Sequence, residues 1–528
     1  MRPVRRAVEE KRPAPEARDW WRDAVFYQVH LRSFADSDGD GIGDLEGLRS
    51  RLGYLELLGV DAVWLTPFYR SPMADNGYDV TDPRSVDPVF GDLDAFDAVL
   101  ADAQETGIRV IVDVVPNHSG DLHPWFGEAL AEGRGGAARE RYVFRDGRGP
   151  DGARPPNDWQ GEFGGPAWTR VPDGQWYLHL FSPRQPDLNW DNAEVQADFE
   201  LTLRFWLDRG VDGVRVGTAH GLAKPAGLPD ATDGTDPRFD EDGVHEIHRR
   251  IRKVLDGYPR TVAVGEIHVP DGARFARYLR PDELHLGVDS GLIRTEFDAD
   301  ALQAAVDESL ATVAEVGAPA TWTLGDHDTG RQVSRHGGGD RGRARARAMA
   351  LVELALPGAV FLYNGEELGL DDVELPTESL TDPRVRLSGG TDRGRDGVRV
   401  PIPWEGTDPP FSFSTGETSW LPIPGRWAAL TVEAQLEDTA STLSLYRQAL
   451  ELRQSHPAFT GDHVEWFGAP AGCFALRRHS GDEDEDGALI CALNTSAAPI
   501  SLPPGEVLLT SAPMVDGRLP PDAAAWLV

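Results

Sequence analysis

The chain has 528 residues, of which 40% are hydrophobic, and its formal net charge is −35 at pH 7. A polypeptide of this length can bury a large catalytic core together with one or two smaller domains. The strong negative charge repels phosphate backbones and anionic lipids, so it argues against nucleic-acid and membrane-surface functions and favours a neutral or cationic small-molecule ligand.

The start of the chain and its cysteines indicate in which cellular compartment the protein is expected. Residues 1–18 are rich in Arg, Pro and Glu without an apolar segment, which predicts a loose leader and no signal peptide. No run of about 18 apolar residues follows, so we expect a cytoplasmic monomer or dimer with no membrane or nucleic-acid partner. The two cysteines, Cys473 and Cys491, cannot form a disulfide framework, and we expect free buried thiols, with a structural pair as the alternative.

Short apolar stretches alternate with helical patterns along most of the chain. Residues 92–106 and 194–209, for example, carry apolar side chains at helical spacing. The near-continuous apolar character of the other stretches is typical of parallel strands buried on both faces. Eight such strands predict an α/β fold, a (β/α)8 TIM barrel, with a doubly wound sheet as the alternative. The predicted strands are residues 24–34, 59–68, 107–115, 210–216, 261–267, 283–289, 319–325 and 358–364.

Two connections in this pattern are too long for simple loops. Residues 119–190 follow the third strand and predict an inserted subdomain, and the turn-rich residues 366–430 follow the eighth. From about residue 456 the pattern changes to alternating strands such as 473–478 and 487–493, joined by the acidic turn SGDEDEDG, which we expect to be a solvated hairpin tip. The expected domains are a barrel (1–118 and 191–455), an inserted subdomain (119–190) and a C-terminal antiparallel β-sandwich (456–528).

Polar side chains gather where the predicted strands end. In a barrel of this kind the carboxyl ends of the strands meet at one site. Carboxylates and imidazoles hydrogen-bond sugar hydroxyls, and a carboxylic acid can protonate a glycosidic oxygen, so the set indicates chemistry on a polyhydroxylated substrate. The residues at these ends are Asp113, Asn117, His118, Arg215, Glu266, His327 and Asp328.

A glycine-rich loop near the N-terminus, DSDGDGIGD (36–44), carries aspartates at alternating positions. This spacing suits a hard cation with oxygen ligands, and we expect a structural Ca²⁺ or Mg²⁺ there, with a solvated turn as the alternative. The loop begins like an EF-hand, but its twelfth position is Gly47 and not glutamate. The expected ligands are Asp36, Asp38, Asp40, Asp44 and the backbone carbonyl of Ile42.

Seven segments resemble those of the α-amylase family of glycoside hydrolases (family 13), in its oligo-1,6-glucosidase and α-glucosidase branch. The resemblance covers residues 20 to about 455, and the C-terminal domain fits it too. It implies a retaining glycosidase or transglucosidase, and in that branch the acid-rich loop after the first strand binds calcium or magnesium. The segments are DVVPNH (113–118), GVRVGTAH (213–220), GE (265–266), GDHD (325–328), DNGYDVTDP (75–83), FSPRQPDLNW (181–190) and RVPIPW (399–404).

The resemblance also implies roles for single residues. Glu266 corresponds to the general acid/base and Asp328 to the carboxylate that stabilises the transition state. Thr218 follows the nucleophile position, where threonine is usual in α-1,4 enzymes and valine in α-1,6 enzymes, so short maltose-type substrates are implied. The residues implied to line the first glucose subsite are Asp75, Tyr78, His118, Phe181, Gln185, Arg215, His327 and Arg399.

One departure falls at the centre of the expected reaction. Two residues after the arginine the family carries the aspartate that attacks the anomeric carbon, and this chain has Gly217. Loss of a nucleophile costs about 10⁴–10⁶ in rate, so we expect a nearly inactive hydrolase. Loss of a neighbouring negative charge also predicts a lower pKa for Glu266. Further departures are His30, Asp326, Asn364 and the segment 287–292.

Three explanations of the glycine stay open. In the first, the glycine is an engineered replacement of a parental aspartate, made to trap a bound sugar or to run glycosynthase chemistry with an anion in the cavity that the substitution leaves. Alternatively, the protein is a natural sugar-binding protein without hydrolysis, or a natural enzyme that uses an external nucleophile, with inversion. The survival of the other site residues favours the first explanation, and the further departures favour natural drift.

Overall fold

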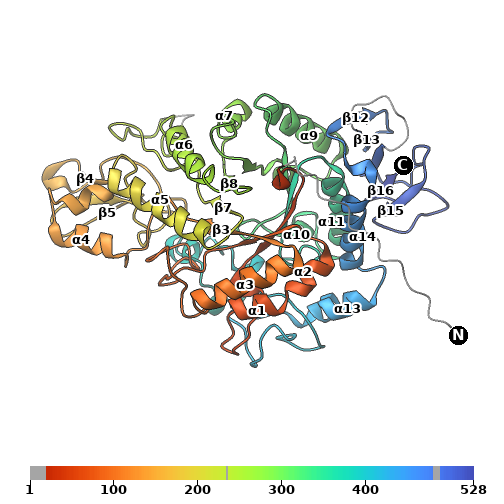
Figure 1. Ribbon diagram of the computed structural model, residues 1–528, viewed down its shortest axis with the longest axis horizontal. Helices are drawn as coiled ribbons and strands as arrows, with labels where there is room; N and C mark the ends of the chain where they lie inside the picture. The colour runs from red at the N-terminus through yellow and green to blue at the C-terminus, as the bar shows by residue number, and fades with distance from the viewer. Residues whose placement is uncertain (1–18, 233–235, 480–487) are drawn as a thin grey trace.

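A parallel barrel forms the centre of the computed structural model, which describes residues 19–232, 236–479 and 488–528 (Figure 1). Its eight strands hydrogen-bond in the order β10-β11-β1-β2-β3-β7-β8-β9. The Thr321 hydroxyl joins the two ends of this sheet, because it donates to the Gly287 carbonyl and accepts from the Asp289 N–H. The predicted (β/α)8 barrel is therefore confirmed. The strands are β1 (Val25–Val29), β2 (Ala62–Leu65), β3 (Arg109–Val114), β7 (Gly213–Val216), β8 (Val262–Glu266), β9 (Leu286–Val288), β10 (Thr321–Thr323) and β11 (Ala359–Tyr363).

Burial on both faces explains the apolar character of these strands. Phe26, Trp64 and Phe361 belong to a cluster inside the barrel, whereas Val25 and Val63 on alternate positions pack into the outer core. Each strand is shorter than predicted, at one or both of its ends.

Helices cover the outside of the barrel, and many of them start at a capping side chain. The predicted helix at 92–106 is α3, whose N-cap Asp92 accepts from the Ala95 N–H, and the one at 194–209 is α5, capped by Asn192. The α-helices are α1 (Leu45–Ser50), α2 (Leu52–Leu58), α3 (Leu93–Thr106), α4 (Pro124–Glu132), α5 (Ala193–Asp208), α6 (Val244–Leu255), α7 (Gly272–Arg277), α8 (Gly291–Arg294), α9 (Ala299–Ala314), α10 (Gln332–Arg335), α11 (Gly339–Ala355), α12 (Pro383–Leu387), α13 (Val432–Glu437) and α14 (Thr442–Ser455).

The long connection after β3 folds beside the barrel. It contains α4 and a three-stranded antiparallel sheet in the order β4-β6-β5, at the left of Figure 1. Phe126, Phe144 and Tyr177 form part of its own apolar cluster. The connection after β11 has only short helices, and it brings Arg395 and Arg399 over the barrel. The strands are β4 (Phe144–Asp146), β5 (Trp168–Arg170) and β6 (Gln175–Leu178).

The C-terminal strands form one antiparallel sheet, in the order β12-β13-β14-β16-β15. Within residues 456–479 and 488–528 there is no second sheet, which corrects the expected β-sandwich. Helix α11 takes the place of that layer, since it packs against β14 and β16 with buried apolar residues such as Leu351 and Val352, and the Trp526 indole donates to the Leu351 carbonyl. The strands are β12 (His463–Phe467), β13 (Cys473–His479), β14 (Leu489–Asn494), β15 (Val507–Thr510) and β16 (Ala523–Leu527).

Cys473 and Cys491 lie on adjacent strands of this sheet, and both are free and buried, as predicted. The expected leader (1–18) and the acidic turn (480–487) lie outside the described residues. Among the helices that are described, none is both long and apolar enough to cross a bilayer.

Candidate active site

The carboxyl ends of β3, β7 and β8 meet through the Arg215 guanidinium. Its Nη1 lies 2.9 Å from Asp113 Oδ1, and its Nη2 lies 2.9 Å from Glu266 Oε2. The backbone N–H of Thr218 donates to the same Glu266 oxygen over 2.7 Å. Arg215 is buried, so both ion pairs are largely shielded from water.

These contacts hold Glu266 as a carboxylate. Its other oxygen, Oε1, lies 3.2 Å from Nε2 of the half-exposed His268, which donates to it. Burial raises the pKa of Glu266, but Arg215 and then His268 outweigh burial and hold that pKa well below its usual range. The protonated form of Glu266, which could donate a proton, is therefore disfavoured at neutral pH.

Gly217 follows β7 directly and is buried between these groups. Its N–H donates to the Val114 carbonyl over 2.9 Å, and its backbone lies outside the left-handed region, so an L side chain fits the conformation. A Cβ there would lie 3.1 Å from Arg215 Nη1 and 3.3 Å from the Val114 carbonyl oxygen. Arg215 thus lies against the space beside Gly217, which we expected to be an open cavity. Its guanidinium pairs there with the Asp113 and Glu266 carboxylates.

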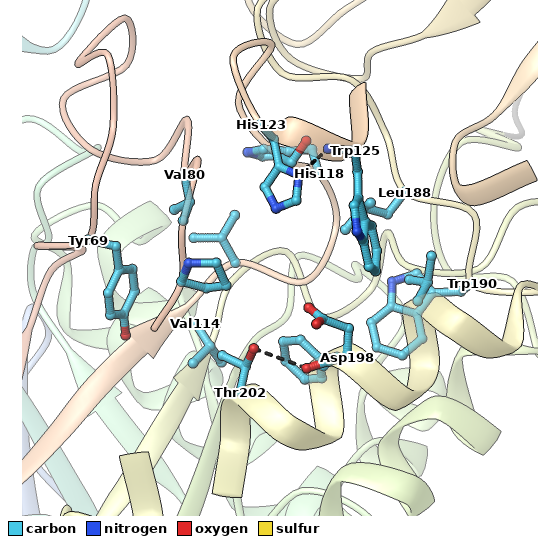
Figure 2. Close-up of a pocket in the computed structure, with 15 residues that line it drawn as sticks. Tyr69, Val80, Val114, His118, His123, Trp125, Leu188, Trp190, Asp198 and Thr202 are labelled. Carbon is cyan, nitrogen blue, oxygen red and sulfur yellow. Dashed lines mark hydrogen bonds between the residues drawn. The ribbon is translucent and has the colours of Figure 1, made fainter. Parts of the chain in front are cut away.

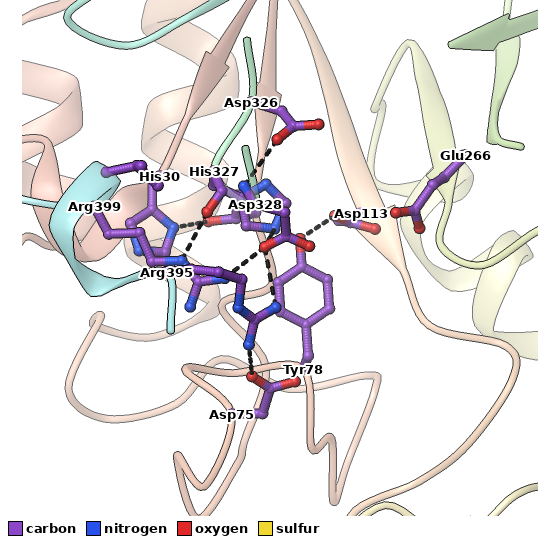
Figure 3. Close-up of polar contacts among 12 residues, drawn as sticks. His30, Asp75, Tyr78, Asp113, Glu266, Asp326, His327, Asp328, Arg395 and Arg399 are labelled. Atoms are coloured by element: carbon purple, nitrogen blue, oxygen red, sulfur yellow. Dashed lines mark hydrogen bonds and ion pairs between the residues drawn. The ribbon is translucent and has the colours of Figure 1, made fainter. Parts of the chain in front are cut away.

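Asp328 lies on the other side of the site, as Figure 3 shows. Its Oδ1 is 3.0 Å from Arg395 Nη1, 2.5 Å from Arg399 Nη2 and 3.4 Å from His327 Nε2. Burial raises the pKa of Asp328, but His327, Arg395 and Arg399 together hold it well below the usual range. Asp328 therefore carries a permanent negative charge, which suits a positively charged transition state.

Aromatic rings and a glutamine support His327. The Tyr78 ring stacks on it with centroids 5.3 Å apart, and the Tyr78 hydroxyl donates to Asp113 Oδ2 over 2.9 Å. Gln28 Nε2 lies 2.6 Å from His327 Nδ1. His30, one of the departures from the family, stacks on His327 at 6.0 Å, and its buried Nε2 has no hydrogen-bond partner among the described residues.

The inserted segment supplies a further wall. Gln185 Nε2 donates to Asp75 Oδ2 over 2.9 Å and lies 3.2 Å from His118 Nε2. The Phe181 and His118 rings have centroids 5.2 Å apart. Asp75 in turn accepts from Arg395 over 2.7 Å, which links this wall to Asp328. All the predicted catalytic and substrate-binding residues therefore lie in one continuous network.

Sequence reasoning missed Arg395 and Lys224. Arg395 contacts Asp75, Asp328 and Asp382, yet it stands in a turn-rich loop with several other arginines, and only its position four residues before Arg399 distinguishes it. Lys224 Nζ lies 2.9 Å from the buried Asp187 carboxylate and 3.0 Å from Asn117 Oδ1, so it ties the inserted segment to the end of β3.

The aspartate loop places three carboxylates together. Asp36, Asp38 and Asp40 each offer an oxygen within 4.8 Å of the others, and hard oxygen donors of this kind fit Ca²⁺ or Mg²⁺. Asp44 lies outside this group of three, and its expected role as a ligand stays a prediction. It caps α1 by accepting the Gly47 N–H over 2.6 Å, because a carboxylate at a helix N-terminus satisfies free backbone donors.

Comparisons with known proteins cover both the barrel and the C-terminal sheet. The model of the alpha amylase catalytic domain matches residues 28–462, and a domain of unknown function (DUF3459) matches residues 460–526. A probable alpha-glucosidase of Rhizobium meliloti (strain 1021) is 38% identical over 507 residues, which cover 91% of this chain and 90% of the relative. An oligo-1,6-glucosidase of Heyndrickxia coagulans is 34% identical over 493 residues, 85% of this chain and 87% of that relative.

A solved structure agrees with these sequence matches. The alpha-glucosyl transfer enzyme XgtA superposes with a TM-score of 0.87 at 36% identity, and the match covers 97% of this chain and 100% of that one.

Proposed function

The chain belongs to the alpha-amylase family of glycoside hydrolases, and on this premise we propose that its site binds short α-1,4-linked glucosides of the maltose type. In this proposal Asp328 stabilises the oxocarbenium-like transition state, and Glu266 is the residue that protonates the glycosidic oxygen in an active form. Thr218 beside Gly217 supports the α-1,4 preference through the family resemblance.

We propose further that the chain as it stands binds such sugars without cleaving them at a useful rate. The observation that carries this is the Arg215–Glu266 ion pair beside a residue with no side chain. A retaining reaction needs a carboxylate to attack the anomeric carbon and a proton on the acid. Gly217 removes the first, and Arg215 disfavours the second.

Binding of maltose to the unaltered chain tests this proposal. Isothermal titration calorimetry should detect maltose binding one to one, more tightly than isomaltose, while chromatography detects almost no glucose over hours. Asp328→Asn is the control, and it should weaken binding because it removes a carboxylate that accepts hydroxyl hydrogen bonds. Rapid hydrolysis of maltose, or tighter binding of isomaltose, would contradict the proposal.

The second candidate is an enzyme that uses an external anion in place of the missing carboxylate. The empty side-chain position favours it, whereas the Arg215 guanidinium close to that position opposes it by narrowing the space. Formate or azide should restore turnover of an activated aryl α-glucoside if this candidate is correct. If both anions leave the rate unchanged, it fails.

Installing a carboxylate at position 217 is expected to raise the pKa of Glu266. The new negative charge repels the Glu266 carboxylate and competes for Arg215, whose charge now depresses the Glu266 pKa. Carbon-13 NMR of labelled glutamates should show the Glu266 titration at higher pH in Gly217→Asp than in the unaltered chain. Gly217→Asn has nearly the same shape without charge and should leave the Glu266 pKa close to its present value; an equal pKa in all three proteins would refute the charge argument.

We also propose that Asp36, Asp38, Asp40 and Asp44, with the Ile42 carbonyl, hold a structural Ca²⁺ or Mg²⁺. Burial, and then like charge from Asp38 and Asp36, raise the pKa of Asp40, so a cation would relieve a real repulsion. The protein is first freed of metal with a chelator. Calcium added to a concentration of about 100 times its Kd should then stabilise the fold by about 2.7 kcal/mol, measured as a rise in Tm. Asp38→Asn should lose most of this rise, and Asp94→Asn on α3 should keep it. An equal rise in both variants would exclude this site.

A further inference from the structure

A small, mainly apolar cavity lies behind His118 of the sugar site (Figure 2). Its volume is about 60 Å³, which is room for a few water molecules and not for a sugar ring. Leu188 and Trp190 from the inserted segment and Val195 from α5 are part of its wall. The part of a ligand beyond the first glucose therefore has to leave the sugar site in another direction.

The rim of the sugar site runs from His268, beside the acid/base, to the inserted segment. His268 lies edge-to-face with His220 at 5.5 Å, and the His220 ring lies 4.9 Å from the Phe239 ring. The guanidinium carbon of Arg238 lies 5.1 Å from the centroid of the Phe239 ring, and its Nη1 lies 2.7 Å from Glu162 Oε1. Arg238 and Glu162 thus satisfy each other in this part of the rim.

Arg384 continues the rim from the loop that follows β11. It lies on the short helix α12, whose N-cap Asp382 accepts the Arg384 N–H over 2.9 Å and pairs with Arg395 at 2.7 Å. The guanidinium carbon of Arg384 lies 5.2 Å from the centroid of the Phe163 ring, and that of Arg395 lies 4.7 Å from the same centroid. Phe163 in turn lies 5.5 Å from Phe181. The half-buried Arg384 therefore stands beside the aromatic wall of the sugar site, outside the buried Arg395.

The charge of Arg384 is uncommitted. Within the part of the chain that the structure describes, Arg384 forms no ion pair, and its buried Nε has no hydrogen-bond partner. Its charge nevertheless reaches the site: burial raises the pKa of Asp328, and Arg384 adds to the nearby positive charges that lower it. An arginine over an aromatic face keeps the N–H groups in its own plane available, and this planar fork matches a carboxylate.

We propose that Arg384 recognises a carboxylate on the part of the ligand beyond the first glucose, so that the site prefers α-glucosides with an acidic aglycone. This inference rests on the sugar site proposed above and adds a class of ligand to it. An arginine and a carboxylate form paired, charge-assisted hydrogen bonds, which are among the strongest in proteins. Partial burial of Arg384 shields such a pair from water and strengthens it relative to a fully exposed pair.

Two aryl α-glucosides that differ in charge test the proposal on the full chain. 4-Carboxyphenyl α-glucoside is an anion at pH 7, and 4-carbamoylphenyl α-glucoside has nearly the same shape without the charge. Isothermal titration calorimetry at low salt should give a Kd at least about 10-fold lower for the carboxylate, and added salt should reduce this ratio. Maltose should displace both ligands. Equal Kd values, or a carboxylate ligand that maltose does not displace, would overturn the proposal.

Two substitutions on α12 locate the effect. Arg384→Gln should bring the ratio of the two Kd values close to 1. Arg386→Gln is the matched control, because it removes the same charge from an exposed position of the same helix, and it should keep the ratio. A ratio that survives in Arg384→Gln, or that falls equally in both variants, would refute recognition by Arg384. Absence of binding by maltose and by both aryl glucosides would instead contradict the sugar site itself, and this inference with it.

Discussion

Gly217→Asp is expected to raise kcat/KM for maltose by about 10⁴–10⁶-fold over the unaltered chain. The new carboxylate would stand two residues after Arg215, at the end of β7, where the family carries its nucleophile. It would also draw Arg215 away from Glu266, so one substitution restores the attacking group and frees the acid to take up a proton.

The backbone at this position accepts the change. Gly217 is outside the left-handed region, and the 3.1 Å contact of an added Cβ is with the end of a flexible arginine side chain, although the 3.3 Å contact with the Val114 carbonyl requires a small shift. Gly217→Asn makes the same contacts without a nucleophile and should stay at background. Glucose release from maltose compares the two variants directly, and background rates in both would leave sugar binding without hydrolysis as the function.

Glu266→Gln in the Gly217→Asp background is expected to lower kcat for maltose by about 10²–10⁴-fold. The amide keeps the shape of the side chain but cannot donate the proton that the departing glucose oxygen needs. In an aryl α-glucoside with an acidic phenol, the phenol departs without full protonation. The rate of the first step with this substrate should therefore fall much less.

Comparison of the two substrates separates this role from a general disturbance. Glu315→Gln, an exposed position at the end of α9, should change neither rate in the same background. Equal losses on maltose and on the aryl glucoside would mean that Glu266 does not act as the proton donor.

Much of the scaffold follows from local sequence. The eight barrel strands are predictable because burial on both faces demands continuous apolar runs, and His118, Arg215, Glu266 and Asp328 fall where those runs end. Short motifs around these ends then give, through the family resemblance, the residues that we expect to line the sugar site.

The remaining features depend on contacts between distant segments. Arg395 reaches Asp75 and Asp328 from a loop without periodicity, so no local pattern beyond its distance from Arg399 marks it. Asp44 is expected as a metal ligand from its spacing, and its role as the cap of α1 is visible only in the fold. The single C-terminal sheet, in place of a sandwich, results from α11 covering its face, which strand patterns alone do not reveal.

The pairing of Arg215 with Glu266 is the most informative of these contacts. From the sequence alone, the arginine faces an absent partner. In the fold it pairs with Glu266 and holds the pKa of that carboxyl well below its usual range, so that in the proposed reaction the absence of a carboxylate at position 217 would change the chemistry of a second residue as well.

Trapping a covalent intermediate tests the role of position 217 most directly. The reaction of Gly217→Asp with a fluorinated α-glucoside that turns over slowly is quenched, and the peptides of the variant are analysed by mass spectrometry. The expected result is a fluoroglucosyl adduct on the peptide that contains residue 217, and no adduct in the unaltered chain or in Gly217→Asn. An adduct on the peptide of Glu266 or Asp328, or full turnover of Gly217→Asp without any adduct, would contradict a nucleophile at position 217.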